Sequence, residues 1–241
     1  MDEQYLRGYR ELYERHWWWR TRDTLLTREV ARIAARHPVR RILDVGCGDG
    51  LFFPVLSRFG EVYGVEPVAD ALDPHGAFRS RIHAGPFDAS YCPDAPFDLV
   101  LALDVIEHLR APHDFLAEVR RMVAPGGWFI ATVPAFRTIW TAHDDLNEHV
   151  TRFTRDELTS LISAHQFEIV DARYFFVLLA VAKFGVRGLE ALLRSKPSPP
   201  GVPAGPVNAV LTALCRAEQS VLGERHPWFG SSLLVVARAL P

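Results

Sequence analysis

The sequence predicts an α/β fold, a doubly wound sheet of seven mostly parallel strands with helices on both faces. Short apolar runs that suit buried strands alternate along the chain with amphipathic runs that have helical spacing, and this alternation is typical of parallel sheets. The first apolar run ends in the glycine-rich turn "GCGDG" (46–50), and the last lies at 231–240. We expect that last strand to be antiparallel and to pair with the strand before it.

The strands are predicted from short apolar stretches and the helices from apolar residues at helical spacing. Helices are expected at 51–59, 113–123 and 155–165. The third has a clear start, since Thr154 lies three residues before Glu157 in the capping-box pattern. The expected strands are, in order, 40–46, 61–67, 81–85, the first part of 97–109, 128–134, 166–176 and 231–240.

The whole chain, 1–241, is predicted to form a single domain. Its insertion contains an apolar helix at 177–194, a Pro/Gly loop at 195–206 and a second helix at 207–222. This insertion could cover the substrate pocket, form a homodimer contact or touch a membrane surface through 177–194, and the sequence fits a monomer or a homodimer. The expected parts are N-terminal helices (1–38), the core sheet (39–176 and 231–241) and a helical insertion between the last two strands (177–230).

The N-terminal part contains two predicted helices, at 3–15 and 22–37, with "HWWWR" (16–20) between them. Three consecutive tryptophans cannot all face one core. At least one of them should therefore border a cleft or the surface.

The composition excludes several classes of protein. Lys plus Arg (27) nearly balances Asp plus Glu (29), whereas a non-specific nucleic-acid binder is usually strongly basic. The three cysteines form no C-x-x-C pair, so we expect neither a disulfide framework nor a zinc site. The N-terminus is charged, unlike a signal peptide. The most apolar run, at 174–182, is shorter than the roughly 20 residues of a membrane-spanning helix. A cytoplasmic protein that binds no nucleic acid is expected.

The glycine turn at 46–50 indicates which kind of cofactor the sheet would bind. Between a strand and a helix, such a turn lets backbone N–H groups approach a ligand. The dinucleotide pattern G-x-G-x-x-G needs a third glycine where this chain has Leu51, and Asp49 would bring negative charge to a pyrophosphate. A nucleoside without phosphates fits better. Glu66, 20 residues after Gly46, can accept hydrogen bonds from both ribose hydroxyls.

Several motifs follow one another between residues 40 and 170: "ILDVGCGDG", the acidic Glu66, "PFD" (86–88), "FDLVLALDVIEHL" and "VAPGGWFIATVP". As a set and in this order they resemble the class I S-adenosylmethionine-dependent methyltransferases, which have a Rossmann-like fold. The resemblance implies S-adenosyl-L-methionine as the cofactor. The residues it implies are Asp44, Gly46, Cys47, Gly48, Leu103 and Asp104 for the methionine part, Glu66 with Pro67 for the ribose, and Phe87 and Asp88 for the adenine.

The flanking segments narrow the resemblance. "ERHWWWRTR", "WTAHDDLNEHVTRFTRDEL" and the final "PWFGSSLLVV" are similar to a bacterial subgroup of small-molecule methyltransferases, in which an N-terminal H-x-W-aromatic-x-x-Arg segment closes over the cofactor. That segment corresponds to His16, Trp18, Trp19 and Arg22. The resemblance implies that Arg22 pairs with the cofactor carboxylate, a role that suits a bidentate guanidinium.

Methyl transfer from a sulfonium is an in-line displacement, so such an enzyme chiefly aligns the reactants in a water-poor pocket. If the acceptor must lose a proton, a positioned base accelerates the reaction. His143 or His149 is the candidate base, and Asp144 or Asp145 is its orienting partner. Arg152 is a candidate for holding an acidic group of the substrate. A loop that simply leads into the capped helix would also explain these residues. Their spacing matches no metal site, so none is expected.

The sequence therefore predicts methyl transfer from S-adenosylmethionine to a small-molecule acceptor, such as a natural-product, sugar-like or lipid-like intermediate. The residues favour none of O-, N- and C-methylation, and His108 is expected to be a packing residue at the end of a strand. Two alternatives are an NAD(P)-dependent oxidoreductase, which the glycine pattern disfavours, and a cofactor-binding interaction protein without catalysis. Neither alternative would form S-adenosylhomocysteine.

Overall fold

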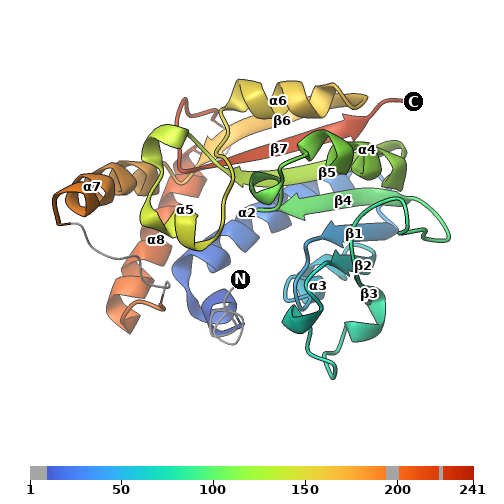
Figure 1. Ribbon diagram of the computed structural model, residues 1–241, viewed down its shortest axis with the longest axis horizontal. Helices are drawn as coiled ribbons and strands as arrows, with labels where there is room; N and C mark the ends of the chain where they lie inside the picture. The colour runs from blue at the N-terminus through green and yellow to red at the C-terminus, as the bar shows by residue number, and fades with distance from the viewer. Residues whose placement is uncertain (1–9, 194–200, 223–224) are drawn as a thin grey trace.

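The computed structural model describes residues 10–193, 201–222 and 225–241, which form one seven-stranded sheet with helices around it (Figure 1). The strand order is β3-β2-β1-β4-β5-β7-β6. β7 is antiparallel to both of its neighbours, and the other neighbouring strands are parallel. The predicted fold class is thus confirmed. The strands are β1 (Arg41–Val45), β2 (Glu61–Glu66), β3 (Ile82–Ala84), β4 (Phe97–Leu103), β5 (Val123–Pro134), β6 (Phe167–Phe175) and β7 (Ser232–Ala239).

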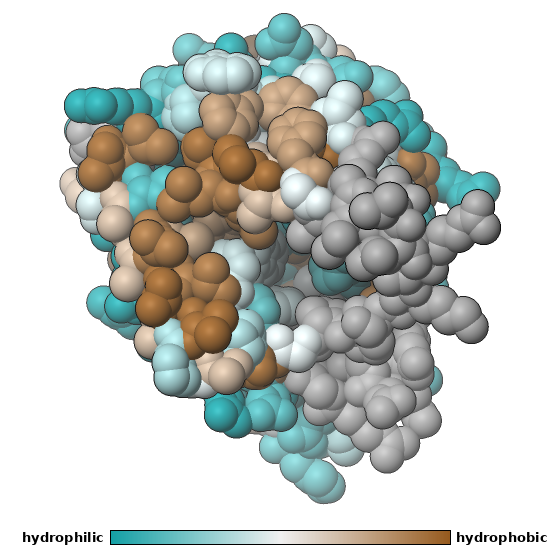
Figure 2. All heavy atoms as spheres, turned by 90° about the vertical axis from the view of Figure 1, so that its left-hand side faces the viewer, coloured by the Kyte–Doolittle hydropathy of each residue, from teal (hydrophilic) through white to brown (hydrophobic). Residues whose placement is uncertain are grey.

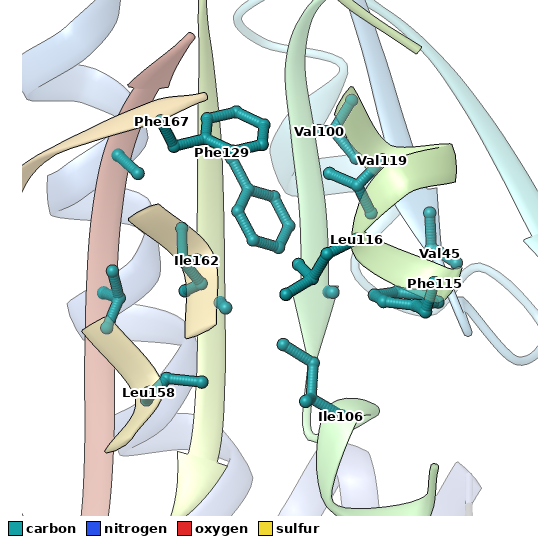
Figure 3. Packing of buried hydrophobic residues seen from close by; sticks show 14 of the residues in the cluster. Val45, Val100, Ile106, Phe115, Leu116, Val119, Phe129, Leu158, Ile162 and Phe167 are labelled. Carbon is teal, nitrogen blue, oxygen red and sulfur yellow. The ribbon is translucent and has the colours of Figure 1, made fainter. Parts of the chain in front are cut away.

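Successive strand residues point to opposite faces of the sheet, and apolar residues on both faces are buried against helices. Val100 of β4 belongs to an apolar cluster with residues of α4 and α6, part of which Figure 3 shows, whereas its neighbour Leu99 belongs to a second cluster with residues of α2, α3 and α8. Both side chains are fully buried. The helices are α2 (Trp17–Ala34), α3 (Phe53–Leu56), α4 (Pro112–Met122), α5 (Ala142–Leu146), α6 (Arg155–Ser163), α7 (Val177–Leu193) and α8 (Gly205–Leu222).

Three elements differ from their expected bounds by more than two residues at one end or both. α2 begins at Trp17 instead of at residue 22, because His16 Nδ1 accepts a hydrogen bond of 3.2 Å from the backbone N–H of Trp18 and caps the helix there. The "HWWWR" segment is therefore mostly helical. α3 is shorter than the expected 51–59, since the left-handed turn at Gly50 (φ +68°) still shapes the chain just before it. β5 begins at Val123, so "APGG", expected to separate a helix from a strand, lies within the strand.

The predicted start of α6 is confirmed. The Thr154 side chain accepts from the backbone N–H of Glu157, and the Glu157 carboxylate accepts from the backbone N–H of Thr154 at 2.7 Å, which completes the capping box. Of the first predicted helix, 3–15, residues 10–15 are described and are helical. The rest of that helix and part of the 195–206 loop lie outside the described residues.

The insertion between β6 and β7 forms the two expected helices, and hydrogen bonds connect α8 to α7 and to α2. The side-chain oxygen of Asn208 in α8 accepts from the backbone N–H of Trp17 at 2.9 Å. The carboxylate of Glu218, also in α8, accepts from the backbone N–H groups of Val177 and Leu178 at 2.8 Å and caps α7. α8 thus joins both helices that border the site described below. Within the described residues, no helix is long and apolar enough to cross a membrane.

Candidate active site

A cavity of about 1050 Å³ opens at the carboxyl edge of the parallel strands, where open α/β sheets bind their ligands. Its size matches the upper end of the ~300–1,000 Å³ range of ligand pockets, which leaves room for a cofactor and a small acceptor. Residues from α2, from the ends of four strands, from the segment after β5 and from α7 line it. Residues singled out in the sequence are among them: His16, Trp18, Trp19, Arg22, Gly46, Gly48, Glu66, Leu103, Asp104, His108, His143, His149 and Arg152.

The glycine turn fixes the carboxylate of Glu66 at one end of this cavity. Gly46 has φ +73°, and a Cβ there would lie 2.7 Å from a methyl carbon of Val105, so only glycine fits. The backbone N–H groups of Gly48 and Val68 each donate to one Glu66 carboxylate oxygen at 2.9 Å. Burial raises the pKa of Glu66, and these two hydrogen bonds partly offset that effect. Each oxygen keeps a further lone pair for a ligand.

The N-terminal helix contributes a cationic and aromatic wall. Arg22, which is 6% exposed, forms an ion pair with Asp104, and its guanidinium lies 5.1 Å from the centre of the Trp18 ring. The Trp19 ring packs edge-on against Trp18 at 5.1 Å. Asp104 has φ +58°, a strained backbone conformation for a residue other than glycine. All three tryptophans line the cavity, so at least one borders a cleft, as predicted.

Asp44, Cys47 and Pro67 do not line the cavity, although they are adjacent in sequence to residues that do. Asp44 is 4% exposed, and burial raises its pKa to about 7. The Cys47 sulfur packs against Gly64, where there is no room for a Cβ. Cys47 therefore fills space beside β2, and its assignment to the methionine part stays a prediction.

Phe87 and Asp88 also lie outside the cavity lining. The Phe87 ring packs against Phe115 at 5.4 Å. The exposed Asp88 carboxylate accepts from the backbone N–H and the hydroxyl of Ser90, at 2.8 and 2.6 Å. Their assignment to the adenine therefore stays a prediction.

The segment after β5 brings together His149, Asp144 and Arg152. His149 Nδ1 lies 2.8 Å from Asp144 Oδ1, and Arg152 Nε donates to the same oxygen at 2.8 Å. Asp144 is fully buried. Burial opposes its ionisation, but the hydrogen bond to His149 and the charge of Arg152 outweigh this effect and hold its pKa well below the usual range. Asp144 can thus orient His149, whose ring lines the cavity, as the predicted histidine–aspartate pair requires.

The other predicted candidates are placed differently. His143 lines the cavity, but its Nε2 lies 3.0 Å from the side-chain nitrogen of Asn147, which can donate to it, instead of from a carboxylate. Asp145 accepts from the indole N–H of Trp140 at 2.9 Å. Arg152 also donates to the carbonyl oxygen of Ala135 at 2.7 Å. Two of its N–H groups are therefore used within the protein, although its side chain borders the cavity.

Glu107 was not identified from the sequence and lies in the turn after β4, next to Ile106. Its side chain is 1% exposed and lines the cavity, and within the described residues neither carboxylate oxygen has a hydrogen-bond partner. Burial, together with the charge of Asp104, raises its pKa well above the usual range. A carboxylate oxygen of Glu107 and one ring nitrogen each of His108 and His149 all lie within 4.8 Å of one another. These three could together hold a divalent cation. The only sequence signal was an acidic residue beside a histidine after a strand.

The chain matches the family model described as a methyltransferase domain over residues 18–172 and belongs to this family. This places it among the class I S-adenosylmethionine-dependent methyltransferases, as the motifs predicted, and S-adenosylmethionine is the cofactor of that family. The family excludes the NAD(P)-dependent oxidoreductase alternative. Membership of the subgroup with the "HWWWR" segment stays a prediction.

Two relatives illustrate the similarity. A ubiquinone biosynthesis O-methyltransferase from Maricaulis maris is 38% identical over 98 residues, which are 37% of this chain and 39% of that protein. A probable S-adenosylmethionine-dependent methyltransferase from Mycolicibacterium smegmatis is 28% identical over 193 residues, 73% of this chain and 69% of that protein. The chain thus matches less than two thirds of the length of the first relative.

Solved structures share the fold at low sequence identity. A putative methyltransferase from Bacillus halodurans has a TM-score of 0.58 and 16% identity, with 89% of this chain and 99% of that chain covered. Phosphoethanolamine N-methyltransferase 2 from Haemonchus contortus, in complex with S-adenosyl-L-methionine, has a TM-score of 0.55 and 12% identity, with 90% and 52% covered.

Proposed function

We propose that the protein transfers a methyl group from S-adenosylmethionine to a hydroxyl of a small-molecule acceptor, with His149 as general base and Asp144 as its orienting partner. The observation that carries the proposal is the 2.8 Å contact between these two side chains, with the His149 ring at the wall of the cavity that also contains Glu66. Several relatives are named ubiquinone biosynthesis O-methyltransferases, which supports a hydroxyl acceptor.

The residues at the strand ends fit the cofactor. We assign the ribose hydroxyls to the Glu66 carboxylate, and the methionine part to the loop at Gly46 and Gly48 with Leu103 and Asp104. Trp18 and Trp19 offer aromatic faces, which suit a sulfonium as cation–π partners. When bound, S-adenosylmethionine supplies an electrophilic methyl group.

The proposed base needs the correct tautomer, a fixed orienting partner and a stabilised imidazolium. The segment after β5 provides all three. Asp144 is buried and ionised, so it holds the Nδ1–H tautomer of His149 and leaves Nε2 to accept a proton from the acceptor hydroxyl. The Arg152 guanidinium, 2.8 Å from Asp144, fixes the carboxylate from behind. After proton transfer, the ionised Asp144 stabilises the imidazolium. The buried Glu107 borders the same space and is suited to hydrogen-bond a second polar group of the acceptor.

An acceptor panel tests this proposal. Purified protein is incubated with S-adenosylmethionine and with matched hydroxyl, amine and activated-carbon acceptors, including lipid-like ones in detergent, and S-adenosylhomocysteine is quantified. We expect turnover with hydroxyl acceptors. Turnover with amine acceptors alone would refute the assignment to O-methylation, and cofactor binding without turnover of any acceptor would favour the interaction-protein alternative.

A further inference from the structure

α8 has an unusual distribution of polarity, because three of its polar residues face inward while large apolar side chains are exposed. Thr212, Glu218 and Gln219 are buried, and the last two donate or accept hydrogen bonds that join α8 to α7 and α2. Its exposed side is mostly apolar, with Arg216 and Ser220 as its polar residues. Four large side chains on that side are about half exposed or more: Val207, Val210, Leu214 and Val221.

α7 extends this exposed apolar surface. Leu178, Val181 and Phe184 are 50%, 57% and 54% exposed. Figure 2 views the side of the molecule on which α7 and α8 lie, and apolar side chains gather there in a broad band. We call the surface formed by these seven side chains the α7–α8 face.

Among the described side chains of α7 and α8, the exposed charge is basic. In 177–185 and in α8, the exposed positions include Arg216 and no acidic residue, and the only acidic side chain, Glu218, is buried. Lys183 lies in the same part of α7 and is partly exposed. Apolar helix faces with basic residues at their edges are typical of helices that lie in a membrane interface. Protein–protein interfaces, by contrast, usually carry about one hydrogen bond per 100–200 Å², and this face offers few polar groups.

The α7–α8 face is continuous with the wall of the active-site cavity. Leu179 and Lys183 line the cavity, whereas Leu178, Val181 and Phe184, on other sides of the same turns of α7, are exposed. A surface in contact with the α7–α8 face would therefore lie beside the cavity. A lipid-like acceptor could then move from that surface into the cavity.

We propose that the α7–α8 face docks on the surface of an anionic lipid bilayer and that the protein takes its acceptor from that bilayer. The exposed apolar side chains enter the headgroup–acyl boundary, and the exposed Arg216 of α8 provides positive charge near the lipid phosphates. This is a surface contact, in keeping with the lack of a spanning helix among the described residues. The part of the proposal that concerns the acceptor rests on the proposed function, whereas docking itself does not.

Vesicle co-sedimentation of the full chain tests the docking. We expect binding to vesicles of equimolar phosphatidylglycerol and phosphatidylcholine, and weaker binding to phosphatidylcholine alone or at high salt. The double variant Val181→Glu/Val210→Glu should lower the partition coefficient roughly tenfold or more, because two charges enter the apolar contact. Val170→Glu is the matched control, since Val170 is 49% exposed on β6, and it should bind like the wild type.

Two further measurements keep the result unambiguous. Calorimetric titration with S-adenosylhomocysteine should give the same affinity for the double variant and the wild type, because neither valine lines the cavity. Light scattering reports the oligomeric state. Failure of the wild type to bind either kind of vesicle would overturn the proposal. A wild-type homodimer that becomes a monomer in the double variant would also overturn it, because the α7–α8 face would then be a dimer interface. Failure of the acceptor panel would leave vesicle binding intact, so the two proposals fail separately.

Discussion

Replacing Glu66 by alanine should weaken cofactor binding more than any other single change at the strand ends. Each carboxylate oxygen of Glu66 already accepts one backbone N–H, from Gly48 or from Val68. One lone pair on each oxygen remains for the two ribose hydroxyls. A hydrogen bond to a charged group contributes about 1.5–3 kcal/mol. Because water partly replaces the lost partners, we expect a total loss of about 2–4 kcal/mol, or roughly 30- to 1,000-fold in Kd.

Isothermal titration with S-adenosylhomocysteine measures this loss. Glu61→Ala is the matched control, because Glu61 lies at the other end of the same strand and is exposed, and it should bind like the wild type. Thermal unfolding of both variants shows whether the glycine turn remains folded. If Glu66→Ala, still folded, bound the ligand within about threefold of the wild type, the assignment of Glu66 to the ribose would be wrong.

Three further predictions concern stability and are checked by denaturant or thermal unfolding of the unliganded protein. Burial raises the pKa of Asp44 from 3.8 to about 7, so between these values the native state holds a proton that the unfolded state has lost. The free energy of unfolding therefore falls by a few kcal/mol as pH rises from about 4 to about 7. Asp44→Asn should make that decline smaller, and an unchanged pH dependence would contradict the assignment. Gly46→Ala should lower the free energy of unfolding by about 2–4 kcal/mol, because of the positive φ and the clash with Val105. In Gly48→Ala the new Cβ meets no atom within 4 Å, so the loss should be only about 1–2 kcal/mol. Equal losses in the two variants would show that the clash does not destabilise the protein. Thr154→Ala should lower the free energy of unfolding by about 1 kcal/mol, because it removes the cap of α6. An unchanged free energy of unfolding would show that the capping box does not stabilise the protein.

The positions of the strands along the chain could be predicted because local sequence patterns define them. Apolar runs and the glycine turn at 46–50 identified the strands and the ligand-binding edge, and the Thr154–Glu157 pattern marked the start of α6. The true start of α2 could not be predicted. It depends on the side chain of His16, whose role as a cap is not evident from residue type.

Contacts in the site could be predicted where the residues are close in sequence. Contacts between distant segments could not be predicted. His149 and Asp144 are five residues apart, so the sequence could predict this pair as one of its alternatives, beside His143 and Asp145. The ion pair between Arg22 and Asp104 joins α2 to the end of β4 across 82 positions, and only the folded chain brings them together. Glu107 was missed because an acidic residue after a strand is usually solvated, whereas here it is buried.

Turnover of an accepted hydroxyl substrate by His149→Ala tests the central claim most directly. S-adenosylhomocysteine formation and S-adenosylhomocysteine affinity are measured in parallel for the wild type, for His149→Ala and for His113→Ala, which removes an exposed histidine of α4. We predict that His149→Ala lowers kcat by about 10²–10⁴, that its affinity for S-adenosylhomocysteine is unchanged, and that His113→Ala behaves like the wild type. An unchanged kcat in His149→Ala would contradict the role of His149 as the general base.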